Sequence, residues 1–243
     1  MFVIFGKDRD LAYPTLFTVC EILGLFSIFL SGLLFDKKLY ASKYVYSWDT
    51  NPFSFHPLMM TLGLLFCYGN AILLYRTFKS TPKPIVKILH ASLLILSLIF
   101  AGIGFAAVIR GKYLGKRPHF QSFHSWLGLT TVALFVLQWI CGFISFLVPQ
   151  LSLNIRQAYM PSHRLWGKII FLSATVAILT GLSEHGYGSS FFTANDAERK
   201  RRLILNFFGV FTSLFSLFVI YLLSNSEYRR LPDEEVVTNE SNT

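Results

Sequence analysis

Four of the six histidines recur along the chain in similar settings. His56, His90, His124 and His163 follow one another at similar intervals, and each opens a stretch of apolar residues. Imidazole is the commonest metal-ligating side chain of proteins. An ionisable group inside an apolar membrane segment is costly and usually has a function. These four histidines are therefore the leading candidates for the chemistry of this protein.

The apolar stretches that carry the histidines are long enough to cross a bilayer. The chain has 243 residues, 53% of them hydrophobic, and a mean hydropathy of +0.51, which is too apolar for a soluble domain. A hydrocarbon core about 30 Å thick needs about 20 apolar residues per helix. Six stretches meet this length: residues 11–35, 55–75, 88–109, 124–148, 163–183 and 203–223. The sequence predicts an all-α bundle of six transmembrane helices with short connections.

Successive helices of such a bundle run in opposite directions. His56 and His124 are then expected near one membrane face, and His90 and His163 near the other. Two imidazoles at one depth on facing helices are what a bis-histidine haem requires. Two such pairs predict two haems, one in each leaflet. Because protein would fill both axial positions, the chemistry left is outer-sphere electron transfer.

Other interpretations of the histidines stay open at this point. Any one of them is explained equally well as an interfacial polar residue at a helix end. Zinc would need four tetrahedral ligands close together, whereas these pairs are expected on opposite faces. Cys20, Cys67 and Cys141 lie within apolar stretches, where a thiol behaves as a small apolar group. The chain lacks a CxxCH motif, which excludes covalent haem attachment.

The basic excess does not indicate a nucleic-acid-binding protein. The formal net charge is +9, but lysines and arginines are scattered over every loop instead of gathered on one face. They are expected to contact lipid headgroups and small anions. Both sides of the membrane carry similar numbers of them, so the positive-inside rule does not decide the orientation.

Four motifs resemble the cytochrome b561 family of ascorbate-dependent transmembrane reductases. They are HPLMM at His56, KILH at His90, SFHSWLG at His124 and PSHRLWG at His163. The resemblance implies a six-helix domain at residues 11–223, with two non-covalent haem b groups in the core formed by helices 2 to 5. It implies a cytoplasmic N-terminus at residues 1–10 and a cytoplasmic tail at 224–243, whose polar composition predicts disorder. His90 and His163 would then hold the cytoplasmic haem.

The resemblance extends to a site for ascorbate on the cytoplasmic side. Residues 71–79, AILLYRTFK, resemble the family's cytoplasmic ascorbate motif. Ascorbate is an anion at neutral pH, and guanidinium and ammonium groups bind anionic oxygens strongly. The candidate ligands are Arg76, Lys83, Lys87 and Arg156. The alternative is that each of these cations only anchors lipid headgroups.

A second substrate site is expected on the lumenal or extracellular side. SFHSW at residues 122–126 resembles the family's motif there, with Phe123 where leucine is usual. The candidate residues are Arg117, His119, Phe120 and Trp126. Cations in this loop suit an anionic radical or a ferric chelate, although His119 is equally well explained as an exposed loop residue.

The resemblance implies an oxidoreductase that transfers electrons from cytosolic ascorbate, through two haems, to monodehydroascorbate or ferric iron on the far side. It also implies a homodimer. The alternative is a haem-binding anchor, sensor or transporter subunit without ascorbate turnover. A Y-x-x-apolar signal at residues 228–231 favours an endosomal, lysosomal or secretory-vesicle membrane, with the plasma membrane as another candidate. Asn70, Gln138 and Ser173 are polar residues within the spans and are candidates to hydrogen-bond the imidazoles, with bonding between helices as the alternative. The basic run at 199–202 departs from the family pattern.

Overall fold

The computed structural model describes residues 5–36, 45–147, 151–186 and 196–230. Within this part of the chain all long elements are helical, and six spans are long and apolar enough to cross a membrane. The elements, in chain order, are α1 (Phe5–Leu33), η1 (Pro52–Ser54), α2 (Phe55–Met60), η2 (Thr61–Cys67), α3 (Tyr68–Thr77), α4 (Lys83–Leu114), α5 (Phe123–Gly142), η3 (Phe143–Leu147), α6 (Leu153–Gly186), α7 (Asp196–Ser224) and η4 (Ser226–Tyr228). Of these, η1 and η4 are short 3-10 segments, and η2 and η3 are short π-helical segments. The predicted all-α, six-span fold is confirmed.

Several helices extend past the apolar stretches that predict them. The third span covers Lys83–Leu114 and the fifth Leu153–Glu184, whereas the apolar runs begin at residues 88 and 163. The additional turns are polar, and polar residues continue a helix readily where it leaves the hydrocarbon layer. His90 and His163 therefore lie inside their helices, while His56 and His124 lie in the first turns of α2 and α5.

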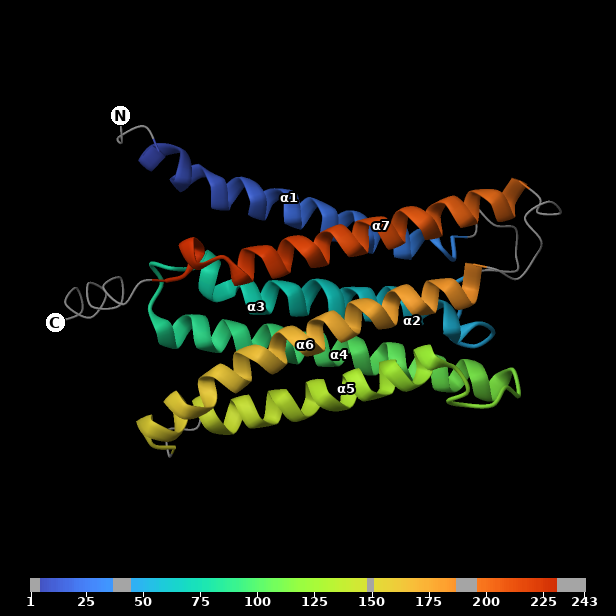
Figure 1. Ribbon diagram of the computed structural model, residues 1–243. Coiled ribbons are helices and arrows are strands. Elements are labelled where there is room, and N and C mark those ends of the chain that lie inside the picture. Colours follow the sequence, from blue (N-terminus) through green and yellow to red (C-terminus); the bar gives the residue numbers. More distant parts are fainter. Residues whose placement is uncertain (1–4, 37–44, 148–150, 187–195, 231–243) are drawn as a thin grey trace.

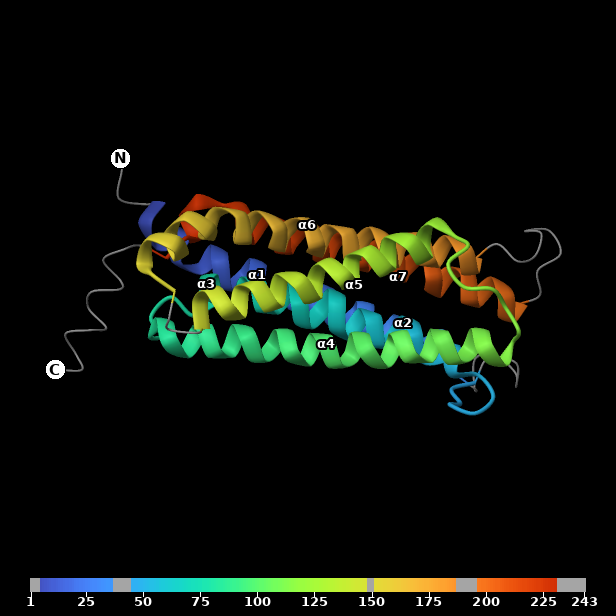
Figure 2. The same ribbon diagram turned by 90° about the horizontal axis from the view of Figure 1, so that it is seen from below.

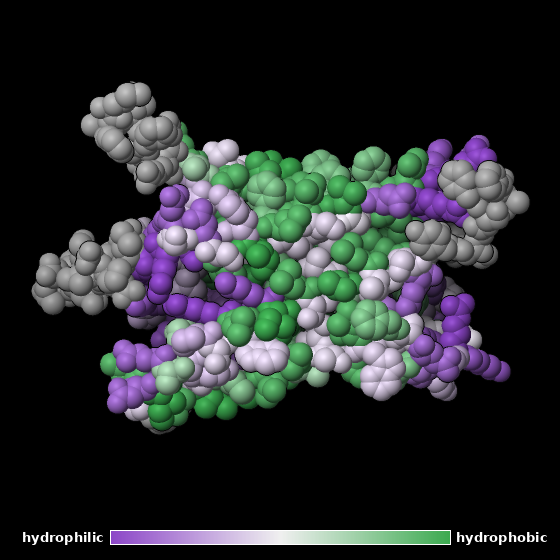
Figure 3. Space-filling view, in the orientation of Figure 1, coloured by the Kyte–Doolittle hydropathy of each residue, from purple (hydrophilic) through white to green (hydrophobic). Residues whose placement is uncertain are grey.

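The helices form an elongated bundle in which sequence neighbours run antiparallel (Figures 1 and 2). α1 packs along α7, α5 along α6, and α4 against the span made of α2, η2 and α3. The start of α1 and the end of α7 lie at the same end of the bundle (Figure 1). We call this the terminal end and the other the distal end. In the view of Figure 3, an apolar belt separates two polar ends, as expected for a membrane protein.

Small residues allow the second and third spans to approach closely. A Cβ atom on Gly63 in η2 would lie 2.7 Å from the carbonyl oxygen of Ser97 in α4. The Ser97 hydroxyl donates to the Gly63 carbonyl oxygen at 2.7 Å. Hydrogen bonds of this kind between helices, with small residues at the contact, are typical of membrane bundles. They fix α2, which carries His56, against α4, which carries His90.

Buried aromatic residues pack α3, α6 and α7 against one another. Phe171 of α6 and Phe215 of α7 are fully buried, and their ring centres lie 6.4 Å apart. The Tyr68 hydroxyl of α3 donates to the Gly167 carbonyl oxygen of α6 at 2.9 Å, so its polar tip is satisfied within the core.

The segment directly after α7 packs against the bundle. Residues 226–228 form η4, and Tyr228 is buried, with its ring 5.1 Å from that of Tyr13 in an edge-to-face contact. The sequence predicts a disordered tail from residue 224 onward, but residues 226–228 of this tail pack on the bundle through the aromatic contact of Tyr228. Residues 231–243 lie outside the described residues.

Candidate functional site

The four recurring histidines lie in two pairs at opposite ends of the bundle. The rings of His56 and His124 are 6.0 Å apart between centres and nearly perpendicular, at 84°. The rings of His90 and His163 are 6.4 Å apart at 71°. The first pair lies at the distal end and the second at the terminal end, as the order of α2, α4, α5 and α6 requires.

Local caps fix the first turns that carry His56 and His124. Ser122 and Ser125 form a capping box at the start of α5, in which each side chain accepts from the other's backbone N–H. Such reciprocal bonds satisfy two of the unpaired donors of a helix start. Before α2, the Ser54 hydroxyl donates to the Asn51 carbonyl oxygen at 2.6 Å. The two histidines are thus held on well-defined helix starts.

Backbone carbonyls orient three of the four imidazoles. The Nδ1 atoms of His56, His90 and His124 lie 2.9, 2.7 and 2.8 Å from the carbonyl oxygens of Gly104, Ala71 and Ala177. A carbonyl only accepts, so Nδ1 carries the proton and Nε2 keeps its lone pair. Metal-ligating histidines in proteins are oriented in the same way.

His163 has a different neighbour at Nδ1. The amide nitrogen of Gln138 lies 3.0 Å from Nδ1 and donates to the His163 carbonyl oxygen at 2.7 Å. His163 is therefore the one imidazole of the four that faces an amide group at this position. Of the other polar candidates, Asn70 donates to Glu21 Oε2 at 3.2 Å and to the Phe66 carbonyl oxygen, so it serves contacts between helices.

The dimensions of both pairs suit two axial ligands of one metal ion. Nitrogens that share a metal each lie about 2 Å from it, and the ring centres are farther apart than the nitrogens. Separations of 6.0 and 6.4 Å are compatible with this arrangement. Among the described residues no three His, Cys, Asp or Glu side chains gather as a metal cluster, so a site here would need further ligands from a cofactor such as a porphyrin.

A cavity of about 670 Å³ is lined by both His56 and His124. Its volume is in the range of small-molecule and cofactor pockets, about 300–1,000 Å³. Gly128 also lines it, and a Cβ atom there would meet no atom within 4 Å. Apolar walls with a histidine on each side fit a flat haem, so the residues present are compatible with the cofactor that the sequence predicts.

Two glycines make room for the histidines themselves. A Cβ atom on Gly181 of α6 would lie 2.8 Å from His124 Cε1, and one on Gly142 of α5 would lie 2.8 Å from His163 Cε1. Both positions were missed in the sequence analysis. A glycine on the helix that faces each histidine is the signal that would have indicated them, but the helix pairing must be known first.

Three of the four distal candidates line the same cavity. Arg117, His119 and Phe120 lie on its wall, while Trp126 is 60% exposed and contacts Phe120 with ring centres 6.4 Å apart. Phe120 has a positive φ of 55°. A left-handed backbone at a bulky residue is strained and is often found at functional sites. The loop thus presents an aromatic and cationic rim next to His124.

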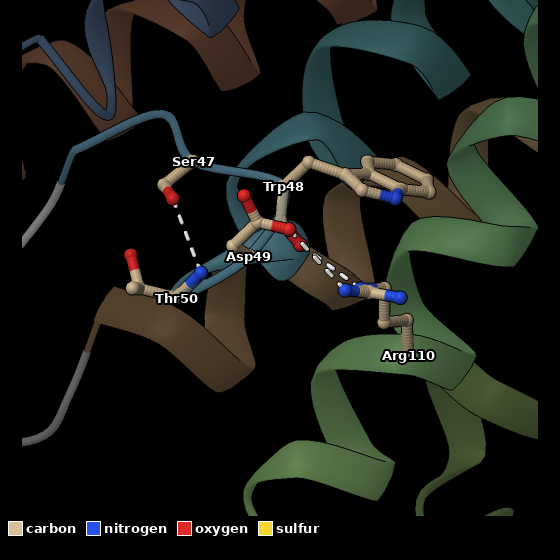
Figure 4. Close-up of polar contacts among 5 residues, drawn as sticks. All are labelled: Ser47, Trp48, Asp49, Thr50 and Arg110. Atoms are coloured by element: carbon tan, nitrogen blue, oxygen red, sulfur yellow. Dashed lines mark hydrogen bonds and ion pairs between the residues drawn. The ribbon is translucent and has the colours of Figure 1, made fainter.

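Another cation of this region, Arg110, is occupied by the loop before α2. Its Nε donates to the Trp48 carbonyl oxygen at 3.0 Å, and its Nη2 lies 3.4 Å from Asp49 Oδ1 (Figure 4). The backbone N–H of Thr50 donates to the Ser47 hydroxyl, which tightens the same turn. Arg110 thus fastens this loop to α4.

Tyr46 joins the same loop to α1. Its hydroxyl donates to the Gly32 carbonyl oxygen. Burial, with a smaller effect of Asp36, raises the pKa of Tyr46 to about 12, so the hydroxyl stays a donor at neutral pH.

The terminal end gathers three of the four predicted ascorbate ligands. Lys87 lies within electrostatic reach of Arg156 and Lys83. The Arg156 Nε atom is buried and has no hydrogen-bond partner among the described residues. A guanidinium nitrogen in this state is costly unless an anion binds it. These three cations from α4 and α6 therefore form a candidate anion site, which we call the terminal cation cluster.

Arg76, the fourth predicted ligand, has a different set of partners. Its Nη1 donates to the Asn225 carbonyl oxygen and its Nη2 to the Leu223 carbonyl oxygen, both at 2.7 Å. The charges that act on it belong to Tyr13, Arg229 and Arg164. Arg76 thus connects α3 to the end of α7.

Comparison with known proteins points to the same family that the four histidine motifs resemble. Residues 55–189 match the eukaryotic cytochrome b561 family. The chain is 32% identical to the lysosomal membrane ascorbate-dependent ferrireductase CYB561A3 of Danio rerio over 88% of this chain and 89% of the relative. It is 32% identical to the transmembrane ascorbate-dependent reductase CYB561 of Homo sapiens over 90% of this chain and 86% of the relative. It is 35% identical to the lysosomal ferrireductase CYB561A3 of Rattus norvegicus over 80% and 78%.

Proposed function

Because the chain belongs to the eukaryotic cytochrome b561 family, we propose that it is an oxidoreductase that transfers electrons from ascorbate across a membrane to an acceptor on the other side. The single observation that carries the mechanism is the presence of two facing histidine pairs at opposite ends of one bundle. The alternative, a haem-binding anchor, sensor or transporter, is not favoured, because the relatives carry the names of ascorbate-dependent reductases.

Each histidine pair is proposed to hold one non-covalent haem b. His56 and His124 would be the axial ligands at the distal end, and His90 and His163 those at the terminal end. Bis-histidine haem supplies reversible one-electron chemistry without an open coordination site. The carbonyls of Gly104, Ala71 and Ala177 hold three imidazoles with Nε2 available. The family orientation would place the terminal end in the cytosol.

The terminal cation cluster is proposed to bind ascorbate. Lys83, Lys87 and Arg156 present ammonium and guanidinium donors at the end of the bundle that holds His90 and His163. Their charges would hold the ascorbate anion and favour its charged oxygens. Arg76, also predicted as a ligand, would contribute mainly by fixing the end of α7.

The distal rim is proposed to receive the acceptor. Arg117, His119 and Phe120 line the cavity wall, with Trp126 beside Phe120. A guanidinium group and aromatic faces suit monodehydroascorbate or a ferric chelate. Both acceptors are anionic in common forms, so Arg117 would bind either through charge.

The multi-pass membrane location follows from the six apolar spans. The names of the zebrafish and rat relatives include the lysosomal membrane, so we propose an endosomal or lysosomal membrane for this chain. A secretory-vesicle or plasma membrane is the alternative. A homodimer is proposed from the family resemblance alone.

Proteoliposomes test the function directly. The purified protein is placed in vesicles that enclose ascorbate, with ferric citrate and a membrane-impermeant ferrous indicator outside. We expect external iron reduction that requires the protein and is abolished in both His90→Ala and His124→Ala. The same rate in protein-free vesicles, or full activity in either variant, would contradict transmembrane transfer through the two histidine pairs.

A further inference from the structure

The basic run at the start of α7 has one member that enters the distal cavity. Arg199 is paired with Asp196 at 3.9 Å and is 62% exposed, and Lys200 is exposed. Arg201, in contrast, lines the cavity that His56 and His124 share. Arg201 therefore has surroundings that Arg199 and Lys200 do not share, although the sequence of the run looks uniform.

Arg201 stands at the polar edge of an apolar helix face. Leu205 and Phe208 follow it by four and seven residues and line the same cavity, at 5% and 1% exposure. Residues at these spacings lie on one side of a helix. The α7 face toward the cavity is therefore apolar in depth and cationic where it approaches the membrane surface.

The rest of the rim is also mainly cationic. Lys112 and Arg117, from the end of α4 and the loop after it, also line the cavity, and Glu184 is the carboxylate among the lining residues. Three cations against one carboxylate leave a positive rim around an apolar interior. An apolar ligand with carboxylates at one edge complements such a cavity, and a porphyrin that carries two propionates has this form.

We infer that Arg201 binds a propionate carboxylate of the haem held between His56 and His124. The inference rests on the proposed function, because it requires haem at this pair. A guanidinium group presents two parallel N–H donors that match a carboxylate, and such charge-assisted bonds are the strong ones. Arg201 thereby positions the haem edge from α7, a helix that supplies none of the four histidines.

Redox titration of purified variants tests the charge of Arg201. Arg201→Gln is compared with Lys200→Gln, an exposed neighbour of the same charge, and with Arg201→Lys. A nearby cation favours the reduced haem, which carries one positive charge fewer. We expect Arg201→Gln to lower the midpoint potential of the haem that His124→Ala lacks, and to leave the other haem unchanged. Arg201→Lys and Lys200→Gln should both stay near the parent value.

Reconstitution with a modified haem tests the carboxylate itself. The apoprotein is loaded with haem or with haem dimethyl ester, whose propionates cannot form the bond. The loss of one charge-assisted bond in Arg201→Gln should weaken distal binding of haem by about tenfold or more relative to the parent protein. Haem dimethyl ester, which cannot form this bond, should bind Arg201→Gln and the parent protein equally well. An equal loss with haem and ester would overturn the inference.

Two further results separate the possible failures. If Arg201→Gln changes only the KM of the acceptor and leaves potential and haem binding unchanged, Arg201 binds the acceptor and the inference is wrong. If the parent protein binds no haem at either pair, the proposed function fails first. Haem at both pairs with Arg201→Gln indistinguishable from Lys200→Gln refutes the inference about Arg201 alone.

Discussion

Arg76 on α3 donates a hydrogen bond of 2.7 Å from Nη1 to the carbonyl oxygen of Asn225, one residue beyond α7. Its Nη2 donates an equally short bond to the Leu223 carbonyl oxygen. The last carbonyls of a helix lack partners within the helix and form the negative end of its dipole. Arg76 therefore caps α7 from a neighbouring helix and ties the two ends of the second and sixth spans together.

Arg76→Gln is expected to reduce stability more than ascorbate affinity. Two charge-assisted bonds are lost, which at this partly exposed position should cost about 1–2 kcal/mol of unfolding free energy. Thermal unfolding in detergent should show a lower midpoint, while the KM for ascorbate changes little in the folded fraction. A large rise in KM at unchanged thermal stability would instead show that Arg76 binds ascorbate directly.

Lys87→Gln and Arg156→Gln are expected to show the opposite behaviour. Each removes one cation from the terminal cation cluster, and a lost charge-assisted bond to an anion corresponds to about tenfold or more in affinity. Stopped-flow reduction by ascorbate should give a higher KM with unchanged haem spectra. Arg199→Gln, which removes a charge at the distal end, is the matched control. Equal effects of all three substitutions would mean that net charge alone matters.

Gln138→Glu is expected to lower the potential of the haem at the terminal end only. A carboxylate at this position would accept a hydrogen bond from His163 Nδ1–H, which the amide nitrogen of Gln138 cannot do. A hydrogen bond of this kind makes the imidazole a stronger ligand. Stronger donation favours ferric iron. Potentiometry with optical detection measures both haems, and a shift in the distal haem, or none in either, would contradict the assignment of His163.

Gly181→Ala is expected to remove the distal haem. The new Cβ atom would lie 2.8 Å from His124 Cε1, closer than van der Waals contact permits, so His124 must move. Gly102→Ala is the control, because a Cβ atom there meets nothing within 4 Å. The haem content per chain should fall for Gly181→Ala alone. Full haem content in both variants would show that His124 can shift without loss of its role.

The length of the apolar stretches predicted the architecture well, because each span is a local property of about 20 residues. The six apolar stretches correspond to the six spans, and the antiparallel order places His56 near His124 and His90 near His163. The ends of helices were less predictable. Lys83 and Leu153 begin helices well before the apolar runs, because helical hydrogen bonding continues into polar residues.

Contacts between distant parts of the chain could not be predicted from one sequence. Arg76 lies in the stretch that resembles the family's cytoplasmic ascorbate motif, yet its hydrogen-bond partners are the carbonyl oxygens of residues 223 and 225. Gln138 and Ser173 looked equivalent as polar residues within spans, but the described contacts of Gln138 lead to His163. Which of several similar side chains faces a site depends on helix rotation, and apolar patterning fixes rotation poorly when both core and lipid are apolar.

The visible spectrum of the purified protein during a redox titration with ascorbate tests the central claim most directly. Parent protein is compared with His90→Ala, His124→Ala and, as a control, His119→Ala, a cavity-lining histidine that is not assigned as an axial ligand. We expect two low-spin haems in the parent and in His119→Ala, and the loss of a different haem in each of the other two variants. A haem-free parent protein, or the loss of the same haem in both, would contradict the central claim.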